Sequence, residues 1–300
     1  MNILPADRKW KLGALMAAAV VMAAAVAVAA ALLSSGPGKQ VQTYDFLIGS
    51  AFVEGRQQLP EDLNAVIVKA NPGVAKIDSS LMRRIRSEHR GALLINYEQA
   101  FALNDEEAAD ARRKGFLSHT CAGQEIHPQN IPSVTLLDGT DPVAVRWRAR
   151  TIADESVVNR ADGTYLDTLR PYFNTGFYDG APCHLSQRGW LKGSISLVDK
   201  VTRKTGGKPV IVNGSGLQSG KGYFTHQAAA DELIAHSWGV QIEQFLRNEK
   251  NARLDVRYMN HLVSMGKRVF AKCKNADGVC RSYIEKSRRP HLTYVRLGEG

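Results

Sequence analysis

From residue 44 onward, short apolar runs alternate with longer amphipathic stretches. Apolar runs bounded by turn residues are typical of buried strands, and apolar positions three to four apart are typical of helices. We expect strands at 46–48 or 65–68, 92–95, 134–137, 163–166, 210–212, 232–235 or 240–242, 269–271 and 292–295. We expect helices at 79–89, 105–114, 143–158, 185–205 and 253–265. This alternation predicts βα units and a parallel sheet.

Turn and cap residues support these boundaries. Asn104 precedes Glu106 and Glu107, as a helix N-cap does, and Gly206 and Gly266 follow two of the predicted helices, where a left-handed residue is expected. An open nucleotide-binding sheet would begin with a glycine-rich phosphate loop, but neither GxGxxG nor GxxxxGK[ST] occurs. We therefore predict an α/β fold, a (β/α)8 barrel over 44–300, with its chemistry at the carboxyl ends of the strands.

The stretch 12–33 is an uninterrupted apolar run. At about 1.5 Å per helical residue it is long enough to cross a hydrocarbon core of about 30 Å. Arg8, Lys9 and Lys11 precede the run, which predicts a cytoplasmic N-terminus at 1–11, a transmembrane anchor at 12–33, a linker at 34–43 and an extracytoplasmic barrel. A cleaved signal peptide is the alternative, and it would leave the barrel secreted.

The four cysteines fit an oxidising compartment. Cys273 and Cys280 flank a turn-rich segment short enough to be closed by a disulfide, and Cys121 and Cys183 would form the second pair. The C-x-x-C spacing typical of zinc sites does not occur, and the histidines are too scattered to nominate a ligand set. We expect neither a metal nor a cofactor.

The formal charge of +10 is concentrated near the C-terminus, where residues 247–300 hold thirteen Lys and Arg against five Asp and Glu. Such a segment could meet an acidic polymer or anionic lipid, although a solvated helical face is the simpler interpretation. Because no nucleic-acid-binding motif is present, we do not expect a nucleic acid partner.

Two carboxylates that end different predicted strands are the main catalytic candidates. Asp167 closes the strand at 163–166, and Glu243 follows the apolar run at 240–242. Glycosidic cleavage needs two such groups, one to attack or stabilise the oxocarbenium-like centre and one to protonate the leaving oxygen. Each has an alternative role, Asp167 as a turn cap and Glu243 as a solvent-facing residue.

Further polar and aromatic residues near strand ends are candidates for substrate binding. Asn213 follows the run at 210–212 and offers an amide to a sugar hydroxyl, unless it is only a turn residue. The remaining substrate-binding candidates are Asp162, Glu98 and Asp138, with Tyr172 and Trp238 as stacking faces.

The sequence Asp162 to Thr168, read DGTYLDT, resembles the "DGxxxDt" strand of glycoside hydrolase-like barrels, in particular the group called hypothetical glycosyl hydrolase family 15. The segment 208–214 is similar to the "kPvivNG" strand of that family, 230–245 to its "aDg…vEnf" segment and 266–269 to its "GKxV" strand. The resemblance covers about 45–298 and implies a (β/α)8 barrel acting on glycosidic bonds. It implies Asp167 as nucleophile or electrostatic stabiliser and Glu243 as acid/base, although this chain has an insertion at 233–238 before the glutamate.

These observations favour a membrane-anchored, extracytoplasmic glycoside hydrolase acting on a cell-envelope or extracellular polysaccharide. The main alternative is a non-catalytic barrel that binds glycans or scaffolds an envelope assembly. A metal-dependent deacetylase is a third possibility, but the usual pair of histidines on one helical face is missing.

Overall fold

The computed structural model describes residues 42–48, 59–61, 63–70, 77–273, 277–285 and 289–296. The predicted span 12–33, its N-terminal flank 1–11 and most of the linker, 34–41, lie outside these residues. Within the described ranges, no helix has the length and apolar character that crossing a bilayer requires. The described residues belong to one compact unit, Gln40–Gly300.

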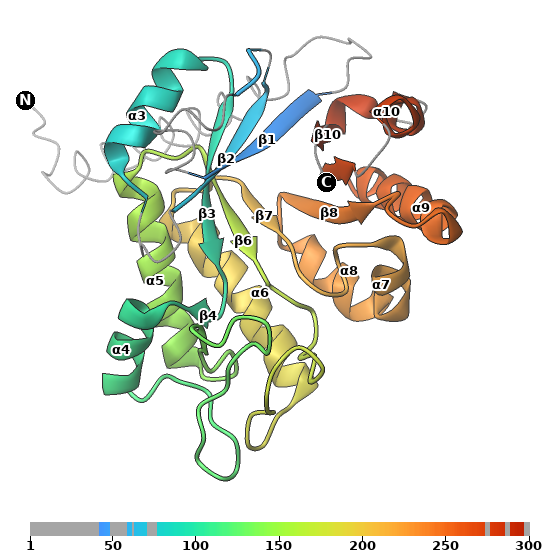
Figure 1. Cartoon of the computed structure of the whole chain (residues 1–300). Coiled ribbons are helices and arrows are strands. Elements are labelled where there is room, and N and C mark those ends of the chain that lie inside the picture. The colour runs from blue at the N-terminus through green and yellow to red at the C-terminus, as the bar shows by residue number, and fades with distance from the viewer. Residues whose placement is uncertain are drawn as a thin grey trace, which may run out of the picture. The chain divides into compact units, whose positions relative to one another are not determined.

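Eight parallel strands close into a barrel in the order β1-β10-β9-β8-β7-β6-β3-β2 (Figure 1). They are β1 (Gln42–Ile48), β2 (Ala65–Lys69), β3 (Leu93–Gln99), β6 (Gly163–Asp167), β7 (Val210–Val212), β8 (Gly239–Phe245), β9 (Arg268–Cys273) and β10 (Thr293–Arg296). Several are nearly continuous apolar runs because both faces of a barrel strand are covered. The predicted (β/α)8 barrel is thereby confirmed.

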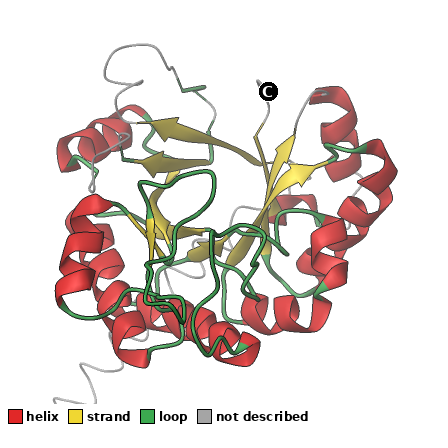
Figure 2. Ribbon diagram, turned by 60° about the horizontal axis from the view of Figure 1, so that its bottom comes forward, coloured by secondary structure: helices red, strands yellow, loops and turns green. Residues whose placement is uncertain are grey.

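Helices surround the strands, as Figure 2 shows. They are α3 (Ser79–Glu88), α4 (Asp105–Arg113), α5 (Pro142–Val158), α6 (Gln187–Lys204), α7 (Gly220–Thr225), α8 (Gln227–Ala235), α9 (Ala252–Ser264) and α10 (Asp277–Glu285), with short 3₁₀ turns η1 (Glu249–Asn251) and η2 (Pro290–Leu292). The predicted cap is present, since Asn104 Oδ1 accepts the Glu107 N–H at 3.1 Å. Gly206 and Gly266 follow α6 and α9 with φ of 74° and 75°, the left-handed conformation that ends a helix.

Three strand predictions need correction. The runs at 46–48 and 65–68 are both barrel strands rather than alternatives. The run at 134–137 holds β5 (Thr135–Leu136), which pairs antiparallel with β4 (Ala102–Leu103) in a separate two-stranded sheet. The alternative at 232–235 lies in α8, so 240–242 supplies the barrel strand. Local apolarity does not distinguish a barrel strand from a short strand outside it, because that choice depends on distant partners.

Strand alternation separates an inner core from an outer one. The inner cluster, which fills the barrel, comprises Tyr44, Ala65, Ile67, Ile95, Tyr165, Ile211, Phe270 and Tyr294. Their strand neighbours, such as Leu166, Val212 and Val269, belong to the cluster shared with the helices. Because successive side chains point to opposite faces, this parity fixes which polar residues at the strand ends face the barrel axis.

Both predicted disulfides are present. Cys121–Cys183 joins the segment after α4 to the loop between β6 and α6, and Cys273–Cys280 joins the end of β9 to α10. Disulfides persist in oxidising surroundings, so they indicate such an environment for the barrel.

Candidate active site

Three polar residues end inward-facing rows on three consecutive barrel strands. Asp167 is the last residue of β6, two positions after the inward-facing Tyr165. Asn213 directly follows β7, and Glu243 lies two positions beyond Gln241, whose side chain bonds to the inner tyrosines Tyr44 and Tyr165. The three side chains therefore meet at the carboxyl end of the barrel, where (β/α)8 enzymes place their chemistry.

Asp167 is held by three neutral donors. Its carboxylate accepts hydrogen bonds from the Tyr97 hydroxyl, from the Thr168 N–H at 2.8 Å and from Asn213 Nδ2 at 2.9 Å. Thr168 has φ of 56°, a left-handed conformation that a β-branched residue rarely adopts. Its hydroxyl donates to Gln99 Oε1 at 2.9 Å, which fixes this strained turn. The orientation of Asp167 is thus determined by β3, β6 and β7 together.

Tyr97 remains a hydrogen-bond donor to Asp167. Burial raises the pKa of Tyr97 well above its ordinary value, and the negative charge of Asp167 raises it further. The phenol therefore keeps its proton at neutral pH. Gln99 Nε2 donates to the Tyr97 oxygen at 2.8 Å, and the ring stacks on Tyr165 with centroids 5.4 Å apart.

Asn213 bridges the two carboxylates. Its Nδ2 lies 2.9 Å from Asp167 Oδ1 and 3.5 Å from Glu243 Oε2. Those two oxygens are therefore at most about 6.4 Å apart, the sum of the two distances. Carboxyl groups about 5 to 5.5 Å apart are typical of retaining glycosidases, and inverting enzymes need about 6.5 to 9.5 Å to admit water. The two facing oxygens are therefore close enough for the arrangement found in retaining enzymes.

Glu243 has fewer partners than Asp167. Besides the long contact with Asn213, its Oε1 lies 3.7 Å from Lys272 Nζ, and both side chains are partly exposed. Lys69 Nζ, from β2, lies 4.7 Å from the centroid of the Tyr97 ring. One carboxylate is thus fixed by hydrogen bonds while the other has room to exchange a proton.

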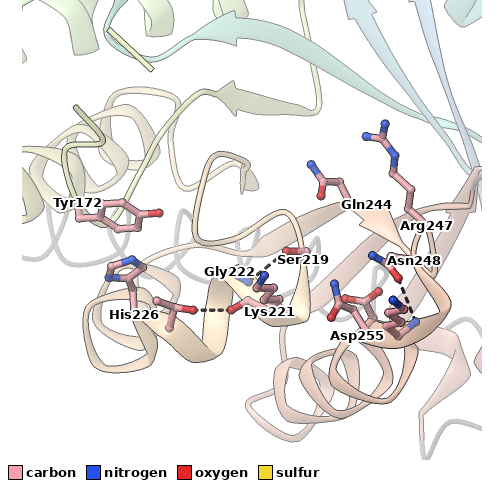
Figure 3. A pocket seen from close by; sticks show the side chains of 12 residues that line it. Tyr172, Ser219, Lys221, Gly222, His226, Gln244, Arg247, Asn248 and Asp255 are labelled. Carbon is pink, nitrogen blue, oxygen red and sulfur yellow. Dashed lines mark hydrogen bonds between the residues drawn. The ribbon is translucent and has the colours of Figure 1, made fainter. Parts of the chain in front are cut away.

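A hollow of about 830 Å³ lies at the same end of the barrel, formed by segments that follow β6, β7 and β8. Figure 3 shows Tyr172 above His226 at one side and Gln244 and Arg247 at the other. The rings of Tyr172 and His226 stack with centroids 3.7 Å apart. Gln244, which lines the hollow, is the residue after Glu243 in the chain.

Two predicted substrate-binding residues lie at the other end of the barrel. Asp162 precedes β6, where it pairs with Arg86 Nη2 at 3.1 Å and accepts the Leu94 N–H at 2.9 Å. Trp238 precedes β8 and packs against Arg268, whose Cζ is 5.5 Å from the ring centroid. Being at the amino ends of their strands, both are separated from Asp167 by the barrel's length, and their placement corrects the expectation that they border the site.

Glu98 points out of the barrel rather than into it. It lies one residue from the inward-facing Tyr97, so the alternation of side chains directs it toward α5. There it is buried, 3.5 Å from Arg148 Nη2, and accepts a hydrogen bond from Asn96 Nδ2 at 2.8 Å. Burial and the negative charge of Glu155 raise the pKa of Glu98. This correction assigns Glu98 to the packing between barrel and helix.

Asp138 also has a structural position. It follows β5 in the two-stranded sheet, and its Oδ1 accepts the Thr140 N–H at 2.8 Å and hydroxyl at 2.6 Å. The carboxylate therefore stabilises the turn that leads into α5 and does not end a barrel strand, which corrects its selection as a rim residue.

The sequence interpretation missed several residues that surround Asp167 and Glu243, namely Tyr97, Gln99, Thr168 and Lys272. The alternation of side chains along a strand could have identified Tyr97 and Gln99, because they lie two and four positions after the inward-facing Ile95. Glu98 lies near the same strand end but on the outward face, which its position along the strand alone does not indicate.

No protein-family model and no curated protein matches the sequence. The resemblance to hypothetical glycosyl hydrolase family 15 therefore stays a prediction. Among solved structures, the glycoside hydrolase domain of a PelA variant from Pseudomonas aeruginosa has a TM-score of 0.51 at 12% identity, covering 78% of this chain and 84% of that one.

Other glycoside hydrolases have similar barrels. An α-amylase from Lactobacillus plantarum has a TM-score of 0.54 at 10% identity over 85% of this chain and 70% of its own. An α-galactosidase from Thermus thermophilus has a TM-score of 0.52 at 10% identity over 86% and 58%. The fold is that of glycoside hydrolase barrels. At these identities the likeness concerns the fold, and activity has to be argued from the site.

Proposed function

We propose that this protein is a retaining glycoside hydrolase with Asp167 as nucleophile and Glu243 as acid/base. The proposal depends on one observation, the sharing of Asn213 Nδ2 by two carboxylates whose facing oxygens are at most about 6.4 Å apart. This separation suits attack by one carboxylate on an anomeric carbon while the other reaches the glycosidic oxygen.

The reaction proceeds in two balanced steps. Asp167 attacks the anomeric carbon and forms a glycosyl ester, while Glu243 gives its proton to the departing glycosidic oxygen. A water molecule then attacks the same carbon, Glu243 takes its proton, and the ester to Asp167 breaks. Two inversions give net retention of the anomeric configuration.

The contacts of the two residues favour this division of roles. Asp167 is oriented by Tyr97, Thr168 and Asn213, as a nucleophile aimed at one atom requires. Glu243 is partly exposed, and the next residue, Gln244, lines the hollow, so a leaving group and then a water molecule can reach the Glu243 carboxylate. An acid/base residue has to contact the leaving group in the first step and the water molecule in the second.

The predicted anchor and the disulfides suggest where the enzyme acts. A barrel held outside the cytoplasm would meet cell-envelope or extracellular polysaccharides, and both disulfides suit that compartment. We propose such a polysaccharide as substrate, with membrane attachment through residues 12–33.

The test is to incubate the full chain, purified in detergent, with a panel of envelope and extracellular glycans and to measure new reducing ends. The first product is examined by NMR for its anomeric configuration before mutarotation. We expect hydrolysis with retention, lost in both Asp167→Asn and Glu243→Gln. Inverted product would exclude Asp167 as nucleophile, and unchanged activity in either variant would refute the two-carboxylate mechanism.

A further inference from the structure

The hollow lined by Gln244 is strongly basic. Lys221, from α7, and Arg247 and Lys250, which follow β8, line it with exposed side chains. None of the three makes an ion pair with any residue in the described ranges. Exposed bases elsewhere often have a carboxylate partner, as Arg112 has in Glu125.

The acidic residue that lines the hollow does not neutralise these bases. Asp255 is 1% exposed, and its two oxygens accept the Gly220 N–H at 2.7 Å and the Leu246 N–H at 3.0 Å. Burial raises the pKa of Asp255. Asp255 therefore fastens the loop after β8 to α7, while the charge presented to a ligand remains positive.

The other lining groups suit a sugar. Gln244, Asn248 and Asn251 offer amides of the kind that bind hydroxyl groups, and the stacked pair of Tyr172 and His226 forms an aromatic wall. A lipid surface would instead favour exposed large apolar side chains beside the bases, and the described lining has none.

We propose that this hollow is a subsite for an acidic sugar unit, whose carboxylate or sulfate is bound by Lys221, Arg247 and Lys250. Guanidinium and ammonium groups bind these anions through charge-assisted hydrogen bonds, and the amides contact the ring hydroxyls. Its position relative to the cleaved bond rests on the proposed glycosidase function, since Gln244 adjoins Glu243. The preference for an anion rests on the hollow alone.

Binding to the full chain tests the subsite, with Glu243→Gln as the common background so that no oligomer is consumed. The probes are an oligogalacturonate, a sulfated galactose oligomer, a neutral galactose oligomer and dihexanoyl-phosphatidylglycerol as a soluble anionic headgroup, each measured by calorimetry. We expect at least one acidic oligomer to bind about tenfold or more tightly than the neutral one, the difference that a charged hydrogen bond typically makes.

The double variant Lys221→Met/Arg247→Met should lose this preference. Its matched control, Arg150→Met/Lys204→Met, removes one lysine and one arginine from exposed positions on α5 and α6, and should keep it. Thermal unfolding of both double variants verifies that each is folded. The arm that loses the preference, carboxylate or sulfate, identifies the group bound.

Three results would overturn the subsite: equal affinity or no affinity for acidic and neutral oligomers, an acidic preference that survives in Lys221→Met/Arg247→Met, or binding of the lipid headgroup alone. Failure of the glycosidase itself is distinguishable. Loss of hydrolysis with the acidic preference intact would leave an anionic glycan-binding site, whereas hydrolysis of neutral glycans without the preference would refute the subsite alone.

Discussion

The two ends of the barrel differ in what their charged side chains contact. At the amino end, Asp162 pairs with Arg86, and Lys267 Nζ donates to the carbonyls of Ala235 and Ser237 at 2.8 and 2.6 Å. At the carboxyl end, Asp167 is held by neutral donors, and Glu243 lies 3.7 Å from its nearest ion partner, Lys272.

This difference separates charges that stabilise the fold from charges available to a ligand. Groups at the amino end meet partners fixed by the chain, so their contribution is to stability. At the carboxyl end, Glu243 has no closer ion partner among the described residues than Lys272 at 3.7 Å, as is expected where a substrate supplies the missing contacts. The same residue types therefore acquire different roles according to the end of the strand at which they lie.

Replacing Asp167, at the end of β6, and Asp162, just before β6, each by Asn should give the largest difference in activity between two variants. Asp167→Asn should reduce kcat at least about a thousandfold, roughly 4 kcal/mol of transition-state stabilisation, because the amide is a poor nucleophile. Asp162→Asn should leave kcat nearly unchanged and cost less than about 1 kcal/mol of unfolding free energy, since its ion pair is partly exposed. Reducing-end assays and urea unfolding measure both. A comparable loss of activity in the two variants would contradict the distinction between the ends.

The next contrast concerns charges buried outside the barrel. Arg148 is 1% exposed and bonds to Glu107 Oε1 at 2.5 Å, with Glu98 at 3.5 Å. Arg148→Met leaves the buried Glu98 and the largely buried Glu107 without their cation, which should cost about 3 to 5 kcal/mol in urea unfolding. Its control, Arg188→Met, breaks an exposed pair with Glu232 and should cost less than about 1 kcal/mol. Similar losses in the two variants would show that burial is not decisive here.

Asn213 tests whether the bridge between the carboxylates matters for catalysis. Asn213→Ala removes the donor shared by Asp167 and Glu243, and we expect kcat to fall about a hundredfold, as for loss of one preorganised donor. The matched control is Asn159→Ala, another buried amide, whose Nδ2 donates to Asn96 Oδ1 at 3.2 Å outside the barrel. It should reduce stability by about 1 to 3 kcal/mol and leave kcat unchanged. Equal kcat in Asn213→Ala and wild type would remove the bridge from the mechanism.

The sequence predicted those features that depend on local patterns or on strand order. The cap at Asn104, the helix ends before Gly206 and Gly266 and the Cys273–Cys280 disulfide follow from neighbouring residues. The meeting of Asp167, Asn213 and Glu243 follows from adjacent parallel strands ending at one side of a barrel. The catalytic roles proposed for these residues are separate predictions, which only measurements of activity can test.

Features that depend on face or on distant pairing were not predictable in the same way. Glu98 lies one residue before the end of β3, where Gln99 is the residue that aligns with Asp167, and this shift of one residue directs Glu98 to α5 rather than to the axis. The run containing β5 reads as a barrel strand, yet it pairs with β4 because the segment after β3 leaves the barrel. The basic hollow combines Lys221 with Arg247 and Lys250 from another βα unit, which no single segment reveals.

The smallest predicted effect is a change in the pH dependence of stability around Glu98. Burial and the nearby Glu155 raise the pKa of Glu98 in the folded protein above its unfolded value. Between those two pKa values the folded state binds more protons than the unfolded state, so stability falls as pH rises. Glu98→Gln removes a slope of at most about 1.4 kcal/mol per pH unit.

Urea unfolding at a series of pH values from 5 to 8 would reveal this change as a flatter profile, and Glu125→Gln provides the contrast. Arg112 lowers the pKa of Glu125, so that carboxylate adds stability above its unfolded pKa, which is lost as the solution is acidified. Glu125→Gln should therefore reduce the loss of unfolding free energy at acidic pH and leave the dependence of that free energy on pH above pH 5 unchanged. A profile in Glu98→Gln as steep as that of the wild type would mean that the proton on this side of α5 is held elsewhere, with Glu155, whose pKa burial also raises, the next residue to replace.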